Sequence, residues 1–168
     1  MPNFHPPLSA FPLVLITLQV FFELLYARSK RAEILYFLKL NLALILLFAA
    51  AAFFSGYQAS ELADQSFQVP NEPIEAHHLS GRFLFFLSMP TCAIGVLSQM
   101  AKHSRANFRV VYLFLLGMLF LIVIRTGLLG GRLVFTHGAG VNVDLSRQKS
   151  SASSELAVEP PSKIEPNF

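Results

Sequence analysis

Four long runs of apolar residues, separated by polar stretches, dominate the chain. At a helical rise of about 1.5 Å per residue, each run is long enough to cross a hydrocarbon core about 30 Å thick. A segment in lipid must satisfy its own backbone hydrogen bonds, so we expect these runs to be α-helices. The pattern predicts an all-α, integral membrane four-helix bundle formed by residues 1–142. The expected spans are residues 8–26, 34–55, 83–100 and 110–129.

The polar stretches predict a loop and a tail. Residues 57–76 are polar and acidic, and we expect a loop there after a helix end at Gly56. The sequence Asn71-Glu72-Pro73 is typical of a helix start, because Asn caps helices and Pro is tolerated in the first turn. Ser, Pro, Glu and Lys dominate residues 143–168 without apolar periodicity, so we expect a flexible tail.

Composition supports a membrane protein. Of 168 residues, 54% are hydrophobic and only 14% are charged, whereas soluble domains carry about 25% charged residues. No phosphate-binding loop, dinucleotide fingerprint or CxxCH haem-attachment motif is present. We therefore expect the lipid bilayer as a partner and no nucleic acid. The lone cysteine, Cys92, lies in an apolar run and is expected to be a packing residue.

The distribution of basic residues predicts the orientation. The turns at 27–33 and 101–109 hold Lys and Arg, whereas the N-terminal segment and residues 57–81 hold none. By the positive-inside rule both turns face the cytoplasm. With four spans, both termini and the tail then lie on the extracytoplasmic side. We expect the membrane to be the inner (cytoplasmic) membrane of the cell. The basic residues of the two turns are Arg28, Lys30, Arg31, Lys102, Arg105 and Arg109.

Four of the five histidines fall at the outer end in this orientation: His5, His77, His78 and His137. Neutral imidazole is a common ligand for haem iron and transition metals. Two of these side chains could hold a haem b between helices, or His5, His77 and His137 could bind a divalent metal ion. Interfacial hydrogen bonding without any cofactor is the alternative.

His77 and His78 lie about 100° apart on a helix, so we expect one of them to face the bundle interior. We favour His77, because Gly81 follows one turn later on the same face and leaves room for a neighbour.

A glycine-rich segment ends the last run. Five glycines occur within residues 126–141, and each costs about 1 kcal/mol relative to alanine inside a helix. We therefore expect a sharp bend or a close approach of the backbone to another group.

Charged residues near the predicted spans allow two interpretations. Arg82, Arg125 and Arg132 are candidates for binding haem propionates or anionic lipid head groups, and the alternative is snorkelling toward the interface. Glu23, the only charge in the first span, is expected to pair with Arg28 or Lys39.

Four short motifs lie at the ends of the predicted spans. They are His5-Pro6-Pro7-Leu8 with Phe11-Pro12, Ser55-Gly56, His77-His78 with Gly81, and Gly130-Gly131-Arg132-Leu133-Val134-Phe135 with His137-Gly138-Ala139-Gly140-Val141. Together they resemble the family of small bacterial membrane proteins called domain of unknown function 2231, over about residues 4–142. The resemblance implies a four-helix membrane domain with histidines near the outer face and no established reaction. It also implies relatives beside c-type cytochrome modules, which favours a redox function, although this sequence contains no such module.

Three functional hypotheses follow. The first is a cytochrome-like protein with haem b near the outer face, which passes electrons between quinone and an extracytoplasmic electron-transfer protein. The second is a non-haem metal-binding membrane protein. The third is a non-catalytic accessory subunit of a larger membrane complex, docked through the glycine-rich turn. A hydrolase is not expected, because no Ser, Asp or Glu is clearly placed beside a histidine base.

Overall fold

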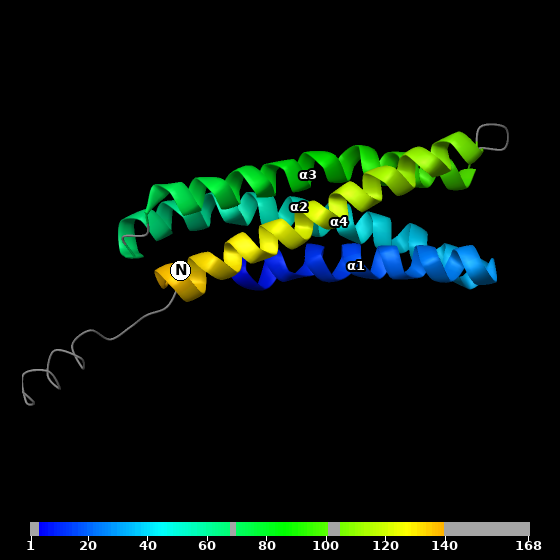
Figure 1. Cartoon of the computed structure of the whole chain (residues 1–168). Helices are drawn as coiled ribbons and strands as arrows, with labels where there is room; N and C mark the ends of the chain where they lie inside the picture. The colour runs from blue at the N-terminus through cyan, green and yellow to red at the C-terminus, as the bar shows by residue number, and fades with distance from the viewer. Residues whose placement is uncertain (1–3, 68–69, 101–104, 140–168) are drawn as a thin grey trace, which may run out of the picture.

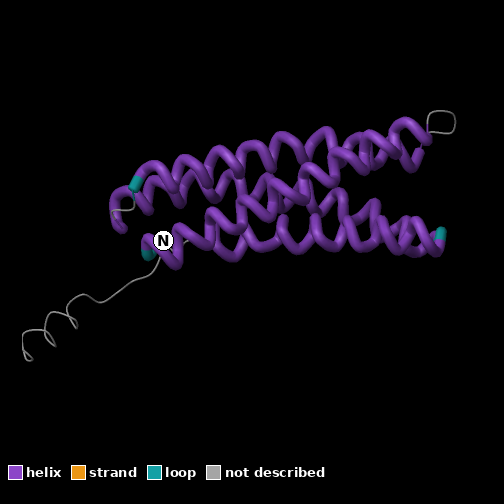
Figure 2. The backbone as a smooth tube through the Cα atoms, viewed as in Figure 1, coloured by secondary structure: helices purple, strands orange, loops and turns teal. Residues whose placement is uncertain are grey.

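The computed structural model describes residues 4–67, 70–100 and 105–139, which form four long helices (Figure 1). Helices account for nearly all of this part of the chain, as the backbone tube shows (Figure 2). The prediction of an all-α, four-helix bundle is confirmed. The predicted tail at 143–168 lies outside the described residues. The helices are α1 (His5–Ser29), α2 (Ala32–Phe67), α3 (Asn71–Met100) and α4 (Arg105–His137).

Successive helices run antiparallel, and each packs against its neighbours in chain order (Figure 1). Helix α4 also packs against α1, so the four helices form a closed ring in cross-section. One end of the bundle, which we call the histidine end, holds the starts of α1 and α3 and the ends of α2 and α4. The other end holds the α1–α2 turn, where Lys30 adopts a left-handed conformation (φ 55°) and its N–H bonds to the carbonyl of Tyr26.

All four helices are long and apolar enough to cross a membrane. Their outward surface carries large apolar side chains such as Phe54 and Phe114, which are 65% and 67% exposed. Such a surface is unfavourable in water and suits lipid. Each predicted span lies within one helix, and the exact limits of the embedded segments remain predictions.

Helix α2 is longer than the sequence suggested. It passes through Gly56 and ends at Phe67, and α3 begins at Asn71, so most of the loop predicted at 57–76 is helical. The predicted helix end at Gly56 is therefore wrong. Residues 57–67 contain strong helix formers and neither Gly nor Pro, so nothing in their backbone chemistry stops the helix. The predicted helix start at Asn71 is confirmed.

A buried polar network connects three helices in the middle of the bundle. The side-chain amide of Gln19 (α1) donates to the hydroxyl of Tyr112 (α4), at 2.8 Å. The amide of Asn41 (α2) donates to Oε1 of Gln19 at 2.8 Å and to the backbone carbonyl of Leu15 at 2.9 Å. In lipid, where apolar surfaces gain little by meeting each other, such hydrogen bonds help to fix the positions of neighbouring helices.

Glu23 pairs with Arg109 of α4 rather than with the predicted Arg28 or Lys39. Its side chain is 3% exposed and faces the bundle interior, whereas Arg28 and Lys39 are exposed on the outside. Because α1 and α4 are antiparallel neighbours, a residue near the start of α4 lies at the depth of one near the end of α1. Local spacing in the sequence does not reveal this partner.

We expect Tyr112→Phe to lower the free energy of unfolding by about 1 kcal/mol, because the buried amide of Gln19 loses its acceptor. Equilibrium unfolding in mixed detergent micelles measures the change. The matched control is Tyr36→Phe on the exposed surface, for which we expect a change within about 0.5 kcal/mol. Equal effects of the two substitutions would contradict a stabilising role for the network.

Candidate functional site

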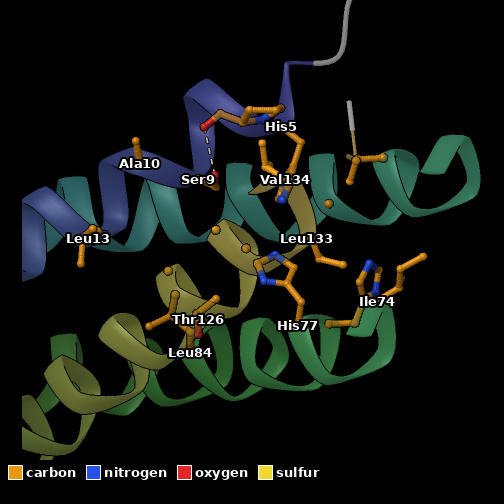
Figure 3. A pocket seen from close by; sticks show the side chains of 18 of the residues that line it. His5, Ser9, Ala10, Leu13, Ile74, His77, Leu84, Thr126, Leu133 and Val134 are labelled. Carbon is orange, nitrogen blue, oxygen red and sulfur yellow. Dashed lines mark hydrogen bonds between the residues drawn. The ribbon is translucent and has the colours of Figure 1, made fainter. Parts of the chain in front are cut away.

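A cavity of about 400 Å³ lies at the histidine end and is lined by residues from all four helices (Figure 3). Its volume falls within the range of small-molecule sites, about 300–1,000 Å³. Most of the lining consists of apolar side chains and glycines. The polar lining comes from the imidazoles of His5, His77 and His78 and the hydroxyls of Ser9 and Thr126. An apolar cavity with a few convergent polar groups is the usual form of a ligand or cofactor site.

His5 is the first residue of α1, and its ring is held by α2. Its Nδ1 lies 3.0 Å from Oγ of Ser55, and the Ser55 hydroxyl lies within hydrogen-bond distance of the carbonyl of Ala52, at 3.2 Å. The direction of the hydrogen bond between Nδ1 of His5 and Oγ of Ser55 depends on the tautomer of the ring, since a hydroxyl can donate or accept.

Gly56 allows His5 to lie this close to α2. A Cβ atom at position 56 would come within 2.9 Å of Cε1 of His5, closer than real Cβ atoms approach other groups. The glycine taken from the sequence as a helix end is instead a point of close approach inside a continuous helix.

His77 meets His5 across the diagonal of the bundle. The two ring centroids are 6.1 Å apart, with an angle of 79° between the planes. On its other side His77 lies against α4: a Cβ at Gly130 would be 3.1 Å from its Cε1, and the backbone of Thr126 accepts a hydrogen bond from its ring. Nδ1 of His77 is buried without a hydrogen-bond partner among the described residues. The Cε1–Nδ1 edge of the ring faces α4, because a Cβ at Gly130 would also lie 3.5 Å from Nδ1.

His78 also lines the cavity, so both histidines of the pair face it. Its ring is half-buried and hydrogen-bonds to the backbone of Gly56 on α2. The two neighbours thus reach opposite sides: His77 contacts α4 and His5, and His78 contacts α2. The argument from Gly81 is wrong, because a Cβ there would meet no atom within 4 Å; the room for His77 comes from Gly130.

The other candidate residues do not line the cavity. His137, the last residue of α4, is absent from its walls, and the side chains of Arg82, Arg125 and Arg132 are exposed. Within residues 4–67, 70–100 and 105–139, no three His, Cys, Asp or Glu side chains are grouped so as to hold a metal ion. The cavity thus brings together three of the seven predicted site residues.

Two contributors were not recognised as such from the sequence. Ser55 orients His5, and the backbone of Thr126 orients His77. Thr126 is itself fixed, since its hydroxyl donates to the carbonyl of Ile122 and lies 2.7 Å from the hydroxyl of Ser80 on α3. Both serine and threonine are common on membrane helices, so only their position beside an imidazole distinguishes them.

Fold and site together define a class: a small four-helix membrane protein with a histidine-lined cavity at one end of the bundle. The family described as "Predicted membrane protein (DUF2231)" matches residues 1–143, and the chain belongs to it. The resemblance inferred from the sequence motifs is confirmed, and the protein is an integral membrane protein. No curated protein and no solved structure matches the chain significantly.

We expect Gly56→Ala to push the His5 ring away and to break its hydrogen bond to Ser55. The NMR signals of the His5 ring should shift, and the free energy of unfolding should fall by about 1 kcal/mol. Gly81→Ala is the matched control, because a methyl group there meets no atom within 4 Å. It should leave His5 unchanged and stabilise its helix by about 0.5–1 kcal/mol. Unchanged His5 signals in Gly56→Ala would refute the close-approach role of this glycine.

Proposed function

We propose that the protein binds haem b in the cavity, with His5 and His77 as the two axial ligands, and acts as an electron-transfer protein in the membrane. The observation that carries the proposal is the pair of imidazoles from α1 and α3, whose centroids are 6.1 Å apart. Two imidazole nitrogens bound to one metal at about 2 Å each lie about 4 Å apart, which separates the ring centres by about 6 Å. The 6.1 Å separation of the ring centroids is compatible with this arrangement.

The hydrogen bonds of both rings support the same ligand set. Metal-binding histidines commonly donate the N–H of the second ring nitrogen to a protein acceptor, which fixes the ring and its tautomer. In the proposed site, His5 donates Nδ1–H to Ser55, the His77 ring hydrogen-bonds to the backbone of Thr126, and the other nitrogen of each ring would bind the metal. The buried Nδ1 of His77 has no hydrogen-bond partner in the described structure, and a metal ligand bond would compensate it.

The surroundings favour haem over a non-haem metal ion. Structural zinc and similar sites use three or four protein ligands, whereas a haem needs two or fewer from the protein. The described residues offer a histidine pair beside a largely apolar space. When bound, haem supplies one-electron redox chemistry, whose potential depends on the axial ligands and on burial. Electrons would pass between quinone in the bilayer and an extracytoplasmic partner.

We expect the purified protein to bind haemin with a Soret band and to give an α-band in the reduced-minus-oxidised spectrum. His5→Ala and His77→Ala should each abolish these signals, while Ser55→Ala should weaken binding by about tenfold as an orienting residue. His137→Ala, outside the cavity walls, should bind haemin as the unchanged protein does. The measurement is an absorbance titration, with metal analysis of the same sample.

Three other outcomes would reject the haem assignment. About one tightly bound metal ion per chain without a Soret band would favour a non-haem site. Absence of both, with haem supplied during expression, would favour an accessory subunit. Equal binding by His5→Ala and His77→Ala would remove this pair as ligands.

We further propose that the histidine end faces outward, as the basic residues at the opposite end require under the positive-inside rule. In a Cys92→Ala background, a membrane-impermeant maleimide should label Glu75→Cys, exposed at the histidine end, in intact cells. It should label Ser29→Cys, exposed at the end of α1, only after the membrane is opened. The reverse pattern would show the opposite orientation.

A further inference from the structure

The cavity at the histidine end is open on one side of the bundle. All four helices contribute to its walls, but the wall residues of α2 and α3 are all buried or half-buried. The exposed wall residues lie on α1 and α4 alone. Since an exposed residue in a cavity wall marks the rim of an opening, the opening lies between these two helices. We call it the lateral mouth, and its residues are Pro6, Ala10 and Leu13 of α1 and Gly127, Val134 and Phe135 of α4.

Two pairs of contacts and exposures describe the extent of the lateral mouth. At its inner edge, Leu13 faces Gly127 across the gap, because a Cβ at Gly127 would lie 3.9 Å from Cδ2 of Leu13. Toward the end of α4, Val134 remains partly exposed and Phe135 is 90% exposed. Leu13 and Val134 are both labelled in Figure 3. The lateral mouth therefore runs along the side of the bundle, from Leu13 to the last turn of α4.

The surroundings of the lateral mouth are those of a lipid-facing surface. All six of its residues belong to helices that are long and apolar enough to cross a membrane. The exposed side chains next to it include Phe11 and Val14 on α1 and Leu128 on α4. Apolar surface of this kind suits lipid rather than water. A molecule that enters the cavity by this side therefore comes from the bilayer.

The chemistry of the lateral mouth indicates what kind of molecule that is. None of its six residues is charged or carries a polar side chain, and an unpaired charge is costly to bury. The polar groups lie deeper in the cavity, where imidazoles and hydroxyls can hydrogen-bond to a hydroxyl or carbonyl oxygen. An uncharged ring with oxygen substituents and an apolar tail matches this order of surfaces.

We propose that a lipid-soluble quinol docks at the lateral mouth and delivers its electrons there. The inference rests on the proposed function, because a haem in the cavity is the electron acceptor. Oxidation of one quinol to the quinone yields two electrons and two protons. It reduces two haem irons from ferric to ferrous, one electron each in successive encounters, and both protons pass to the aqueous phase at the histidine end.

The first test needs no haem and asks what the lateral mouth faces. The chain contains no Trp, so the indole of Val134→Trp is the only one in the protein. In vesicles of brominated phosphatidylcholine, we expect its fluorescence to be quenched as strongly as that of Val14→Trp on the outer surface of α1. Glu75→Trp, exposed near the start of α3, should instead be quenched by iodide in the water. Quenching of Val134→Trp by iodide alone would overturn the proposal.

The second test follows the α-band of the haemin-loaded protein in phosphatidylcholine vesicles after addition of decyl-quinol. Leu13→Trp narrows the lateral mouth, and we expect the rate of reduction per bound haem to fall by about tenfold or more. Reduction by dithionite, which is soluble in water, is the reference and should not fall in proportion. Val14→Trp is the matched control, because it adds the same ring to the next residue of α1, outside the cavity walls.

Each result of the second test has one meaning. An unchanged rate with decyl-quinol in Leu13→Trp overturns quinol docking at the lateral mouth and leaves the proposed function standing. If Leu13→Trp slows both reductants alike, Leu13→Ala decides: quinol reduction slower than in the unchanged protein overturns the proposal, and an equal or faster rate supports it. Failure of the unchanged protein to bind haemin overturns the proposed function and the quinol step together, whereas lipid quenching of Val134→Trp still identifies the lateral mouth.

Discussion

The structure depends on one constraint: in hydrocarbon, a polar group without a partner is costly, and water cannot replace the partner. The helices satisfy their own backbones, and the buried side chains of Gln19, Asn41 and Tyr112 satisfy one another. Among the described residues, four buried polar atoms lack a hydrogen-bond partner: Oε1 of Glu23, Nδ1 of His77 and both side-chain amide atoms of Gln99. Of these three residues, His77 is the one that lines the cavity.

The antiparallel order of the helices explains why the site forms where it does. The starts of α1 and α3 and the ends of α2 and α4 meet at one end, so residues far apart in sequence become neighbours. Two glycine positions then allow the close contacts: Gly56 admits His5, and Gly130 admits His77. The imidazoles are held by backbone and hydroxyl groups of helices other than their own.

The four helices and the candidates His5 and His77 could be predicted, because the sequence shows the length of each apolar run and which residues lie near helix ends. The rotation of each helix about its axis could not. It places His137 and the three arginines outside the cavity, and it turns Glu23 toward Arg109 rather than toward nearer basic residues. Glycine was also ambiguous in the sequence. A glycine such as Gly56 is typical of a helix end, and its actual role, to leave room for the His5 ring, appears only in the structure.

The ion pair between α1 and α4 has a consequence for biogenesis. Spans are synthesised in chain order, so Gln19 on α1 can meet Asn41 as soon as α2 is inserted. The partner of Glu23 arrives only with the last helix. Until then a carboxylate destined for the interior remains uncompensated, and a charge without a partner is unfavourable inside a bilayer. Packing of α4 against α1 thus neutralises the carboxylate of Glu23. A nascent chain truncated before α4 retains this carboxylate without a partner, and quality-control proteases can recognise such an exposed polar group.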